Sequence, residues 1–257
     1  MIIKVCGLSH VGKRRELNED SFGVYGFEDG RLSGVCVLAD GMGGHNAGEV
    51  ASAMAVEAVV NELKEDISEK ESNQISHNIM AAIDYANSNI YEKSLKNPEQ
   101  AGMGTTLVVA YVTDEFVRIA NIGDSRAYVV SDKKICRITV DHSVVEELVQ
   151  RGSITREEAR RHPDKNIITR ALGTDLFVEA DYYDYVPTAG ETILLCSDGL
   201  TEMVDEEEIR DIVSNAENES LAVQSLVEKA NENGGVDNVT VVALRFAEEA
   251  KADDADR

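Results

Sequence analysis

Three aspartates stand at the ends of apolar segments that are predicted to be buried strands. Asp40 follows the run GVCVLA, Asp198 follows TILLCS, and Asp237 comes just before NVTVVAL. Uniformly apolar strands lie in the core of a sheet, so a carboxylate at their end is held rigidly and partly removed from water. Several such groups that converged would repel one another unless a cation neutralised them. Oxygen ligands select hard divalent ions such as Mg²⁺ or Mn²⁺, and these aspartates are therefore candidate metal ligands.

The residues alone leave a second interpretation open. An Asp-Gly pair after a strand is a common turn, and both Asp40-Gly41 and Asp198-Gly199 fit that description. The three aspartates also lie far apart in the sequence, so their spacing does not define a metal site. The chain has no HExxH, EF-hand, Walker-type or GxSxG motif that would assign a reaction. Spacing therefore indicates candidate ligands without a specific chemistry.

Alternating groups of strands and helices must position these side chains. Apolar residues recur every three or four positions from Ala47 onward and again over 73–96, which predicts two amphipathic helices. Short β-rich segments fill residues 104–140 and predict an antiparallel meander. Further strands are predicted at 2–9, 20–28, 34–39, 177–186, 192–197 and 238–246, and further helices at 205–213 and 220–231.

The segment 143–173 interrupts this pattern with two short helices. It is rich in charge and poor in apolar residues, and Thr155 and Glu158 have the spacing of a capping box, so an exposed insertion is predicted. No internal repeat or linker divides the chain, and residues 1–246 are predicted to form one α+β domain with helices on the outer faces of two sheets. Residues 247–257 are acidic and aperiodic and are predicted to be a frayed tail.

Composition narrows the range of partners and compartments. The 257 residues include 25 Lys and Arg against 48 Asp and Glu, a net charge of −23, which argues against nucleic acid and anionic membranes as partners. Hydrophobic residues make up 43%, enough for a sizeable core, and no apolar run approaches the roughly 18 residues of a membrane span. No secretory signal is visible, and four widely spaced cysteines fit a reducing cytoplasm.

Eight short motifs follow one another between about residue 4 and residue 246. They are Gly12-x-x-Arg15-x-x-Asn18-Glu19-Asp20, Ala39-Asp40-Gly41-Met42-Gly43-Gly44-His45, Gly102-Met103-Gly104-Thr105-Thr106, Asn121-Ile122-Gly123-Asp124-Ser125-Arg126, Thr139-Val140-Asp141-His142-Ser143, Ile167-Ile168-Thr169-Arg170-Ala171-Leu172-Gly173, Cys196-Ser197-Asp198-Gly199-Leu200 and Asp237-Asn238-Val239-Thr240. This series resembles bacterial protein phosphatase 2C enzymes, which are metal-dependent Ser/Thr phosphatases. A single Asp-Gly pair would be weak evidence, whereas eight motifs in the order of the family are very specific.

The resemblance implies an α+β fold, a four-layer α-β-β-α sandwich with two antiparallel sheets and a flap insertion. The segment 143–173 corresponds to the mobile flap beside the active site of the family. By the same resemblance, Asp40 would bridge two Mn²⁺ or Mg²⁺ ions, and the carbonyl of Gly41 would complete one coordination shell. Asp198 and Asp237 would bind the ion on the other side.

Four further residues have roles that the resemblance implies. Glu19 and Asp20 would act mainly through water molecules on the metals, and Asp124 matches the position that helps to hold a third, weaker ion in bacterial members. Arg15 would bind the phosphoryl group, because a planar guanidinium matches two phosphate oxygens. The spacing to Asn18-Glu19-Asp20 selects Arg15 rather than its neighbour Arg14.

The proton donor for the leaving oxygen stays unassigned at this point. Many eukaryotic members place a histidine two residues after the bridging aspartate, where this chain, like bacterial members, has Met42. His45, three residues further on, and a metal-bound water are the two alternatives. His142 is expected to organise the loop that enters the insertion.

The function expected from the resemblance is hydrolysis of phosphoserine and phosphothreonine in proteins. Its substrates would include proteins phosphorylated by a bacterial Ser/Thr kinase, or the kinase itself, and the enzyme is expected to be a cytoplasmic monomer. One alternative is a catalytically dead regulator on the same fold, although Asp40, Asp198 and Asp237 are all present. Another is a relative that dephosphorylates an anti-sigma-factor antagonist, but such proteins usually diverge around the flap, and here the flap-end motif ITRALG is intact.

Overall fold

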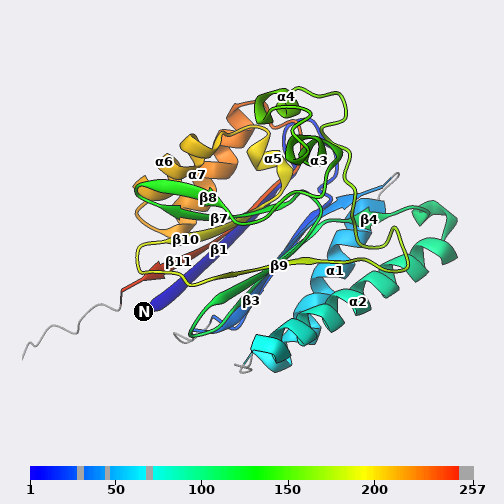
Figure 1. The fold of residues 1–257 in the computed structure, drawn as a ribbon, viewed down its shortest axis with the longest axis horizontal. Helices are drawn as coiled ribbons and strands as arrows, with labels where there is room; N and C mark the ends of the chain where they lie inside the picture. Colours follow the sequence, from blue (N-terminus) through cyan, green and yellow to red (C-terminus); the bar gives the residue numbers. More distant parts are fainter. Residues whose placement is uncertain (28–31, 44–46, 68–71, 249–257) are drawn as a thin grey trace, which may run out of the picture.

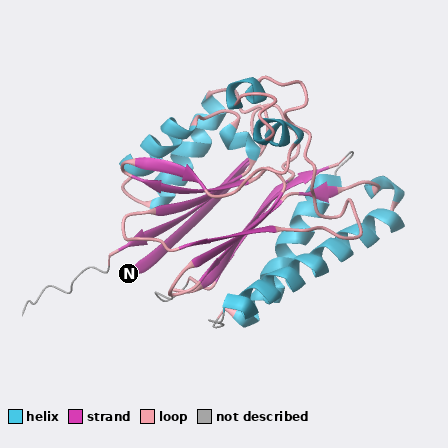
Figure 2. Ribbon diagram, in the orientation of Figure 1, coloured by secondary structure: helices cyan, strands magenta, loops and turns pink. Residues whose placement is uncertain are grey.

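The computed structural model describes residues 1–27, 32–43, 47–67 and 72–248. Its strands form two antiparallel sheets that pack face to face, and helices cover the outer face of each sheet (Figures 1 and 2). This arrangement confirms the predicted α+β class and the four-layer α-β-β-α sandwich.

The first sheet has the strand order β1-β11-β10-β7-β8. Its strands are β1 Ile2–His10, β7 Arg126–Ser131, β8 Lys134–Arg137, β10 Thr192–Cys196 and β11 Val239–Ala247. The second sheet has the order β2-β3-β5-β6-β9, with the short β4 paired to β3. Its strands are β2 Asp20–Tyr25, β3 Gly34–Met42, β4 Gly104–Thr105, β5 Leu107–Val112, β6 Val117–Ile122 and β9 Asp181–Tyr185.

Helices α1 and α2 pack on the second sheet, and α6 and α7 pack on the first (Figure 1). The helices are α1 Ala47–Leu63, α2 Ser72–Lys96, α3 Val144–Gln150, α4 Arg156–Arg160, α5 Asp198–Thr201, α6 Glu206–Asn215 and α7 Glu219–Glu232, with 3₁₀ turns at Lys64–Asp66 and Pro98–Gln100. Local sequence signals set their starts. The Asp205 side chain accepts a hydrogen bond from the Glu208 amide, and Thr155 and Glu158 form the predicted capping box.

The central strands are apolar on both faces because each face enters a different core. In β3, Val35 and Val37 pack toward α1 and α2, whereas Cys36 and Leu38 pack between the two sheets. The same alternation divides β10 and β11 between the inter-sheet core and the core beneath α6 and α7. Burial on both faces therefore explains the uninterrupted apolar runs that end at Asp40 and Asp198.

The predicted meander over residues 104–140 is wrong at its centre. Strands β5 and β6 pair in one sheet, β7 and β8 pair in the other, and β6 does not pair with β7. The chain crosses between the sheets at Gly123–Ser125, where Gly123 has a φ of +97° that an L side chain would rarely adopt. This crossing places Asp124 at the junction of the two sheets.

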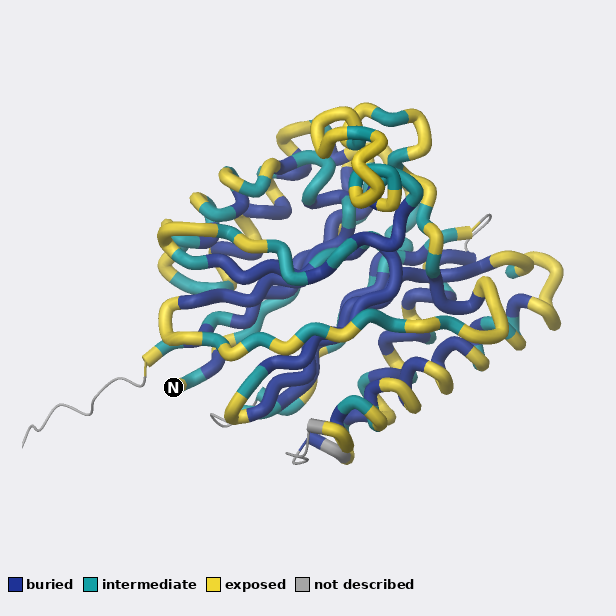
Figure 3. The backbone as a smooth tube through the Cα atoms, viewed as in Figure 1, coloured by how far each residue is buried: buried dark blue, intermediate teal, exposed yellow. Residues whose placement is uncertain are grey.

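The insertion 143–173 is exposed, as predicted, but its base is attached to the sandwich. The burial pattern drawn in Figure 3 leaves helix α4 largely exposed, whereas most residues of α3 are only partly exposed. Isolated β-bridges join Ser143 to Ile168 and Thr105 to Leu172, and Leu172 is fully buried. Glu146 of α3 is buried as well, so the expectation of a segment poor in buried residues fails at its two ends.

Within the part of the chain that the structure describes, no helix is long and apolar enough to cross a membrane. Strand β11 extends to Ala247, one residue beyond the predicted strand, and residues 249–257 of the predicted tail lie outside the described residues.

Candidate functional site

The ends of strands from both sheets meet at one edge of the sandwich. Asp40 lies near the end of β3, opposite Asp20 at the start of β2. Asp198 begins the one-turn helix α5, with only Ser197 between it and β10, and Asp237 lies two residues before the start of β11. The sequence placed Asp198 at the end of a strand but did not predict this helical turn.

Asp20 joins the two sheets at this edge. Its Oδ2 accepts hydrogen bonds from the hydroxyls of Ser197, at 2.8 Å, and Thr240, at 2.7 Å, both of which belong to the opposite sheet or its flanks. Asn238 adds a second link, because its Oδ1 accepts from the Glu19 amide at 2.8 Å and its Nδ2 donates to the carbonyl of Leu17. Glu19 and Asp20 are therefore held by residues of the two motifs that contain Asp198 and Asp237.

The backbone of Asp40 is fixed from the neighbouring Gly-Thr-Thr motif. The Asp40 amide donates to Thr106 Oγ1, and the Asp40 carbonyl accepts from the Thr106 amide and the Thr105 hydroxyl, each at 2.9 Å. Gly41 follows in a space too small for a side chain, because a Cβ there would lie 2.1 Å from the Gly48 carbonyl oxygen. This glycine lets β3 and α1 approach closely next to Asp40.

The carboxylates of the site influence one another through their charges. Burial, followed by repulsion from Asp20 and Asp198, holds the pKa of Asp40 well above its usual range. Burial, followed by repulsion from Asp124 and Glu202, does the same to the pKa of Asp198. The repulsion shows that Asp20, Asp40, Asp124 and Asp198 lie close enough to influence one another's charge.

Three flanking carboxylates also have raised pKa values. Burial raises the pKa of Asp20 to about 6, although the hydrogen bonds that it accepts from Thr240 and Ser197 lower the pKa. Burial, followed by the charge of Asp141, raises the pKa of Asp124 to about 6. Burial raises the pKa of Glu19, although the nearby positive charge of Arg15 lowers it in part.

Arg15 lies at the mouth of this cluster. Its Nη2 donates to Asp237 Oδ2 at 2.7 Å, and its Nη1 lies 3.9 Å from Glu19 Oε2. The Arg15 side chain is 48% exposed, so its guanidinium faces solvent beside the carboxylates. The structure therefore places Arg15, Asp237 and Glu19 together.

The donor set fits a hard divalent cation. All the donors are oxygen atoms, and a cation would relieve the repulsion that raises the pKa values of Asp40 and Asp198. Asp20 Oδ1 is buried and has no hydrogen-bond partner, so it is an acceptor in need of a positive or donating group. No three Asp, Glu, His or Cys side chains of the described residues converge tightly, but Mg²⁺ commonly binds through one or two carboxylates and several waters.

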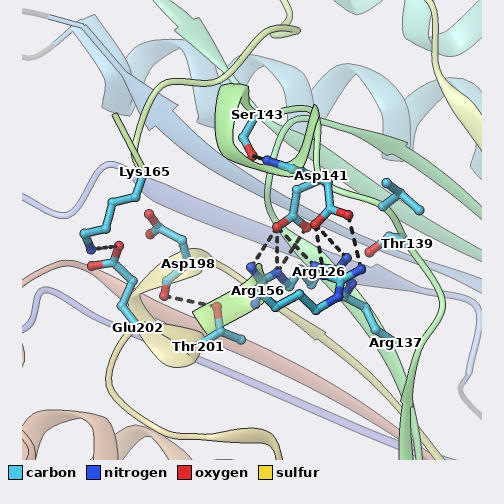
Figure 4. Close-up of polar contacts among 12 residues, drawn as sticks. Arg126, Arg137, Thr139, Asp141, Ser143, Arg156, Lys165, Asp198, Thr201 and Glu202 are labelled. Atoms are coloured by element: carbon cyan, nitrogen blue, oxygen red, sulfur yellow. Dashed lines mark hydrogen bonds and ion pairs between the residues drawn. The ribbon is translucent and has the colours of Figure 1, made fainter. Parts of the chain in front are cut away.

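A second polar network, which the sequence did not predict, borders the site and links the insertion to strands β7 and β8. Arg126 donates to Asp141 at 2.7 Å, and Arg137 bonds to both Asp141 and Glu146. Arg156 of α4 also donates to Glu146, at 3.1 Å. Figure 4 shows the arginines around Asp141 and, nearby, Asp198 beside the ion pair of Lys165 with Glu202. The charged sequence of α4 pointed to solvent and gave no signal for this network.

A cavity of about 460 Å³ lies between the network and the strand ends, with Asp124 and Asp198 in its lining. His142 lies between two lining residues of this cavity, Asp141 and Ser143, and its Nδ1 accepts a hydrogen bond from the Gly123 amide at 3.1 Å. This contact agrees with the expected role of His142 in organising the loop that enters the insertion. His45 lies outside the described residues.

Comparison with known proteins identifies the family. Residues 6–230 match the family described as Protein phosphatase 2C. The chain belongs to this family. The protein phosphatase 2C assignment covers nearly all of the described chain, and it confirms the resemblance and the predicted phosphatase class.

Relatives and solved structures agree with the assignment. The phosphatase is 40% identical over 233 residues to the serine/threonine phosphatase stp of Listeria monocytogenes, covering 91% of this chain and 92% of the relative. The crystal structure of serine/threonine phosphatase Stp1 from Staphylococcus aureus superposes with a TM-score of 0.85 at 38% identity, covering 97% and 96% of the two chains. The catalytic domain of PstP, solved in complex with two manganese ions, gives a TM-score of 0.82 at 34% identity, covering 96% and 99%.

Proposed function

We propose that this chain is a metal-dependent phosphatase that hydrolyses phosphoserine and phosphothreonine in proteins. The observation that supports the proposal most strongly is the convergence of carboxylates with raised pKa values at the sheet junction, with Arg15 beside them. The names of the relatives, which are serine/threonine phosphatases, support the substrate class.

The proposed metal ligands are those that the sequence motifs indicate. Asp40 would lie between two ions, with the Gly41 carbonyl on one of them and Asp198 and Asp237 on the other. Glu19 and Asp20 would act through water, and Asp124 would help to hold a third ion. The two manganese ions in the PstP structure support a pair of divalent ions here, either Mn²⁺ or Mg²⁺.

Divalent ions held by these residues would lower the pKa of a bound water and would offset negative charge on the phosphoryl group. The residues of the chain position the reacting groups. Asp20, held by Ser197 and Thr240, keeps the ends of the two sheets in register, and the Thr105 and Thr106 contacts keep Asp40 in place. Arg15 is anchored by Asp237 on one side and exposed on the other, where its guanidinium can bind two phosphoryl oxygens.

The enzyme would reverse the action of a bacterial Ser/Thr kinase as a monomer in the cytoplasm. All four cysteines lie in the described residues and none forms a disulfide, which supports a reducing compartment.

A phosphatase assay on a phosphothreonine peptide tests the proposal. We expect turnover with Mn²⁺ or Mg²⁺ and no turnover in the presence of a metal chelator. Asp40→Ala should remove nearly all turnover, whereas Asp132→Ala, at an exposed turn between β7 and β8, should leave it unchanged. Binding of the peptide without turnover at either metal would favour the catalytically dead regulator instead.

A further inference from the structure

A pair of large apolar side chains stands exposed in the loop between the insertion and β9. Phe177 is 85% exposed, the largest exposed fraction among the large hydrophobic residues of the described chain, and its neighbour Leu176 is 57% exposed. Single exposed apolar residues are common, whereas contiguous exposed apolar surface marks interaction sites, and these two adjacent side chains form such a surface together.

This loop is held in place rather than left loose. Asn87 of α2, which is buried, accepts a hydrogen bond from the Gly173 amide at 2.7 Å and donates to the carbonyls of Asp175 and Leu176. Gly173 has a φ of +81° and packs so closely on Ile90 that a Cβ would lie 2.2 Å from its Cγ2. The exposed side chains are therefore presented from a fixed backbone, which lowers the conformational entropy lost on binding a partner.

The loop begins at the active-site edge. Leu172 pairs with Thr105, whose hydroxyl donates to the Asp40 carbonyl. Thr174 and Met42 both lie against Gly104, since a Cβ there would be 2.8 Å from Thr174 Cγ2 and 2.9 Å from Met42 Cε. Phe177 follows three residues later, within about 10 Å of Thr174 along the chain. Figure 3 shows this exposed loop beside α2.

The surroundings of the loop are acidic. Between Gly173 and Thr188 the chain has four acidic residues and neither Lys nor Arg. Arg170 and Arg118 already pair with Asp181 and Asp184, whereas Asp175 and Glu179 have no ion pair among the described residues and form the acidic segment beside Phe177. Asp84 of α2 adds another exposed carboxylate, close enough to influence Tyr182 of β9. With a net charge of −23, the protein as a whole attracts basic segments and repels acidic ones.

We propose that Leu176 and Phe177 form a docking element for the phosphoprotein substrate, binding an apolar side chain that lies next to Lys or Arg residues and several residues away from the phosphorylated position. This inference rests on the proposed function and adds to it a preference for substrate sequence. The apolar side chain would contact Phe177, and the basic residues would lie along the acidic segment. The phosphorylated residue would then reach the carboxylate cluster and Arg15.

The test uses phosphothreonine peptides that carry a Leu-Lys-Arg segment at successive distances on either side of the phosphothreonine. Matched peptides replace Leu by Ser, or Lys-Arg by Glu-Glu. Each is assayed with wild type, Phe177→Ser and the control Val186→Ser, which changes another highly exposed apolar residue, 68% exposed, just after β9. The small ester p-nitrophenyl phosphate reports turnover that does not depend on docking.

We expect Phe177→Ser to raise KM about tenfold for the best Leu-Lys-Arg peptide, with kcat unchanged. Turnover of p-nitrophenyl phosphate and of the Leu-to-Ser peptide should not change, and Val186→Ser should behave as wild type. An equal loss on every substrate, or no loss on any peptide, would overturn the docking proposal. So would self-association of the wild type, measured by sedimentation, that Phe177→Ser abolishes, because the pair would then be an interface between copies.

A binding measurement separates this inference from the proposed function. Fluorescence polarisation of the labelled Leu-Lys-Arg peptide in chelator needs no turnover. Weaker binding to Phe177→Ser than to wild type supports docking even if no metal restores activity. Equal binding by both proteins contradicts docking even if the phosphatase assay succeeds.

Discussion

Two neighbouring groups of carboxylates in this phosphatase are held in opposite ways. Asp141 lies just before the insertion and Glu146 lies in its first helix, α3, and arginines from β7, β8 and α4 contact them directly. Burial alone would raise the pKa of Glu146, but hydrogen bonds and charges from Arg137 and Arg156 bring it below its usual range. At the strand ends, burial and mutual repulsion instead raise the pKa values of Asp40 and Asp198.

The difference shows which carboxylates the fold supplies with positive charge. The first group is neutralised by the protein and fastens the insertion to the sheet. The second has Arg15 at its mouth, on Asp237, while Asp40 and Asp198 accept no hydrogen bond or ion pair through their carboxylates from an arginine or lysine of the described chain. Carboxylates without a positive partner suit an added cation. Substitutions in the two groups should therefore have opposite effects.

The largest effect is expected when the second group loses a charge. Asp198→Asn should lower kcat at least about 10³-fold with Mn²⁺, a barrier increase of about 4 kcal/mol. In chelator the same change should raise Tm by about 3 °C, because it removes a source of repulsion. Calorimetry and a peptide assay measure the two effects, with Asp132→Asn as an exposed control. A lower Tm in chelator would show that Asp198 stabilises the fold directly.

The first group should respond in the opposite sense. Glu146→Ala leaves Arg156 without its partner and Arg137 with Asp141 alone, and it should reduce the free energy of unfolding by about 3 kcal/mol. The neighbouring Glu147→Ala, which removes an exposed carboxylate paired with Arg151, should reduce it by less than about 1 kcal/mol. Urea unfolding compares the two variants. Similar values for both would mean that the Glu146 network contributes no more than a surface pair.

Metal binding should stabilise only through the second group. Mn²⁺ at about 100 times its Kd should stabilise the chelated wild type by about 2.7 kcal/mol, or a Tm increase of about 5–10 °C. Asp40→Ala should lose most of this increase, whereas Glu147→Ala should keep it. Differential scanning calorimetry gives both values, and an undiminished increase in Asp40→Ala would place the metal elsewhere.

The smallest effect concerns pH. The pKa of Glu146 is depressed in the folded protein, so its ionised form contributes stability above its unfolded pKa of about 4.5 and loses it as pH falls through the lower folded value. Glu146→Gln should therefore be less stable than wild type by about 1 kcal/mol at pH 7, and the gap should close in acid. Urea unfolding from pH 7 to pH 3 measures the gap. A gap that widened in acid would contradict the assigned sign.

Sequence patterns predicted what local physics determines. The starts of α4 and α6 follow from Thr155 and Asp205, whose capping contacts involve residues three positions away. The failed meander depended on which distant strands pair, and adjacent segments such as β6 and β7 gave no sign that they belong to different sheets. The Glu146 network was missed for a related reason, because its arginines come from three separate elements. Each site aspartate alone was compatible with a turn, and the family resemblance supplied the grouping.

The two ends of the insertion are attached to the sandwich side by side, and this lets the length of the insertion vary among such enzymes. Ser143 and Ile168 are bridged, so the chain leaves and rejoins the sandwich at nearly the same place. Changing the length of a loop whose ends are already adjacent costs little, about 0.6 kcal/mol for each doubling. The segment between these residues can therefore change in length and sequence at little cost in stability. A graft that replaces residues 159–164 retains Glu146, Arg156 and the capping Glu158. It also retains Lys165, whose ion pair with Glu202 lies beside Asp198 (Figure 4).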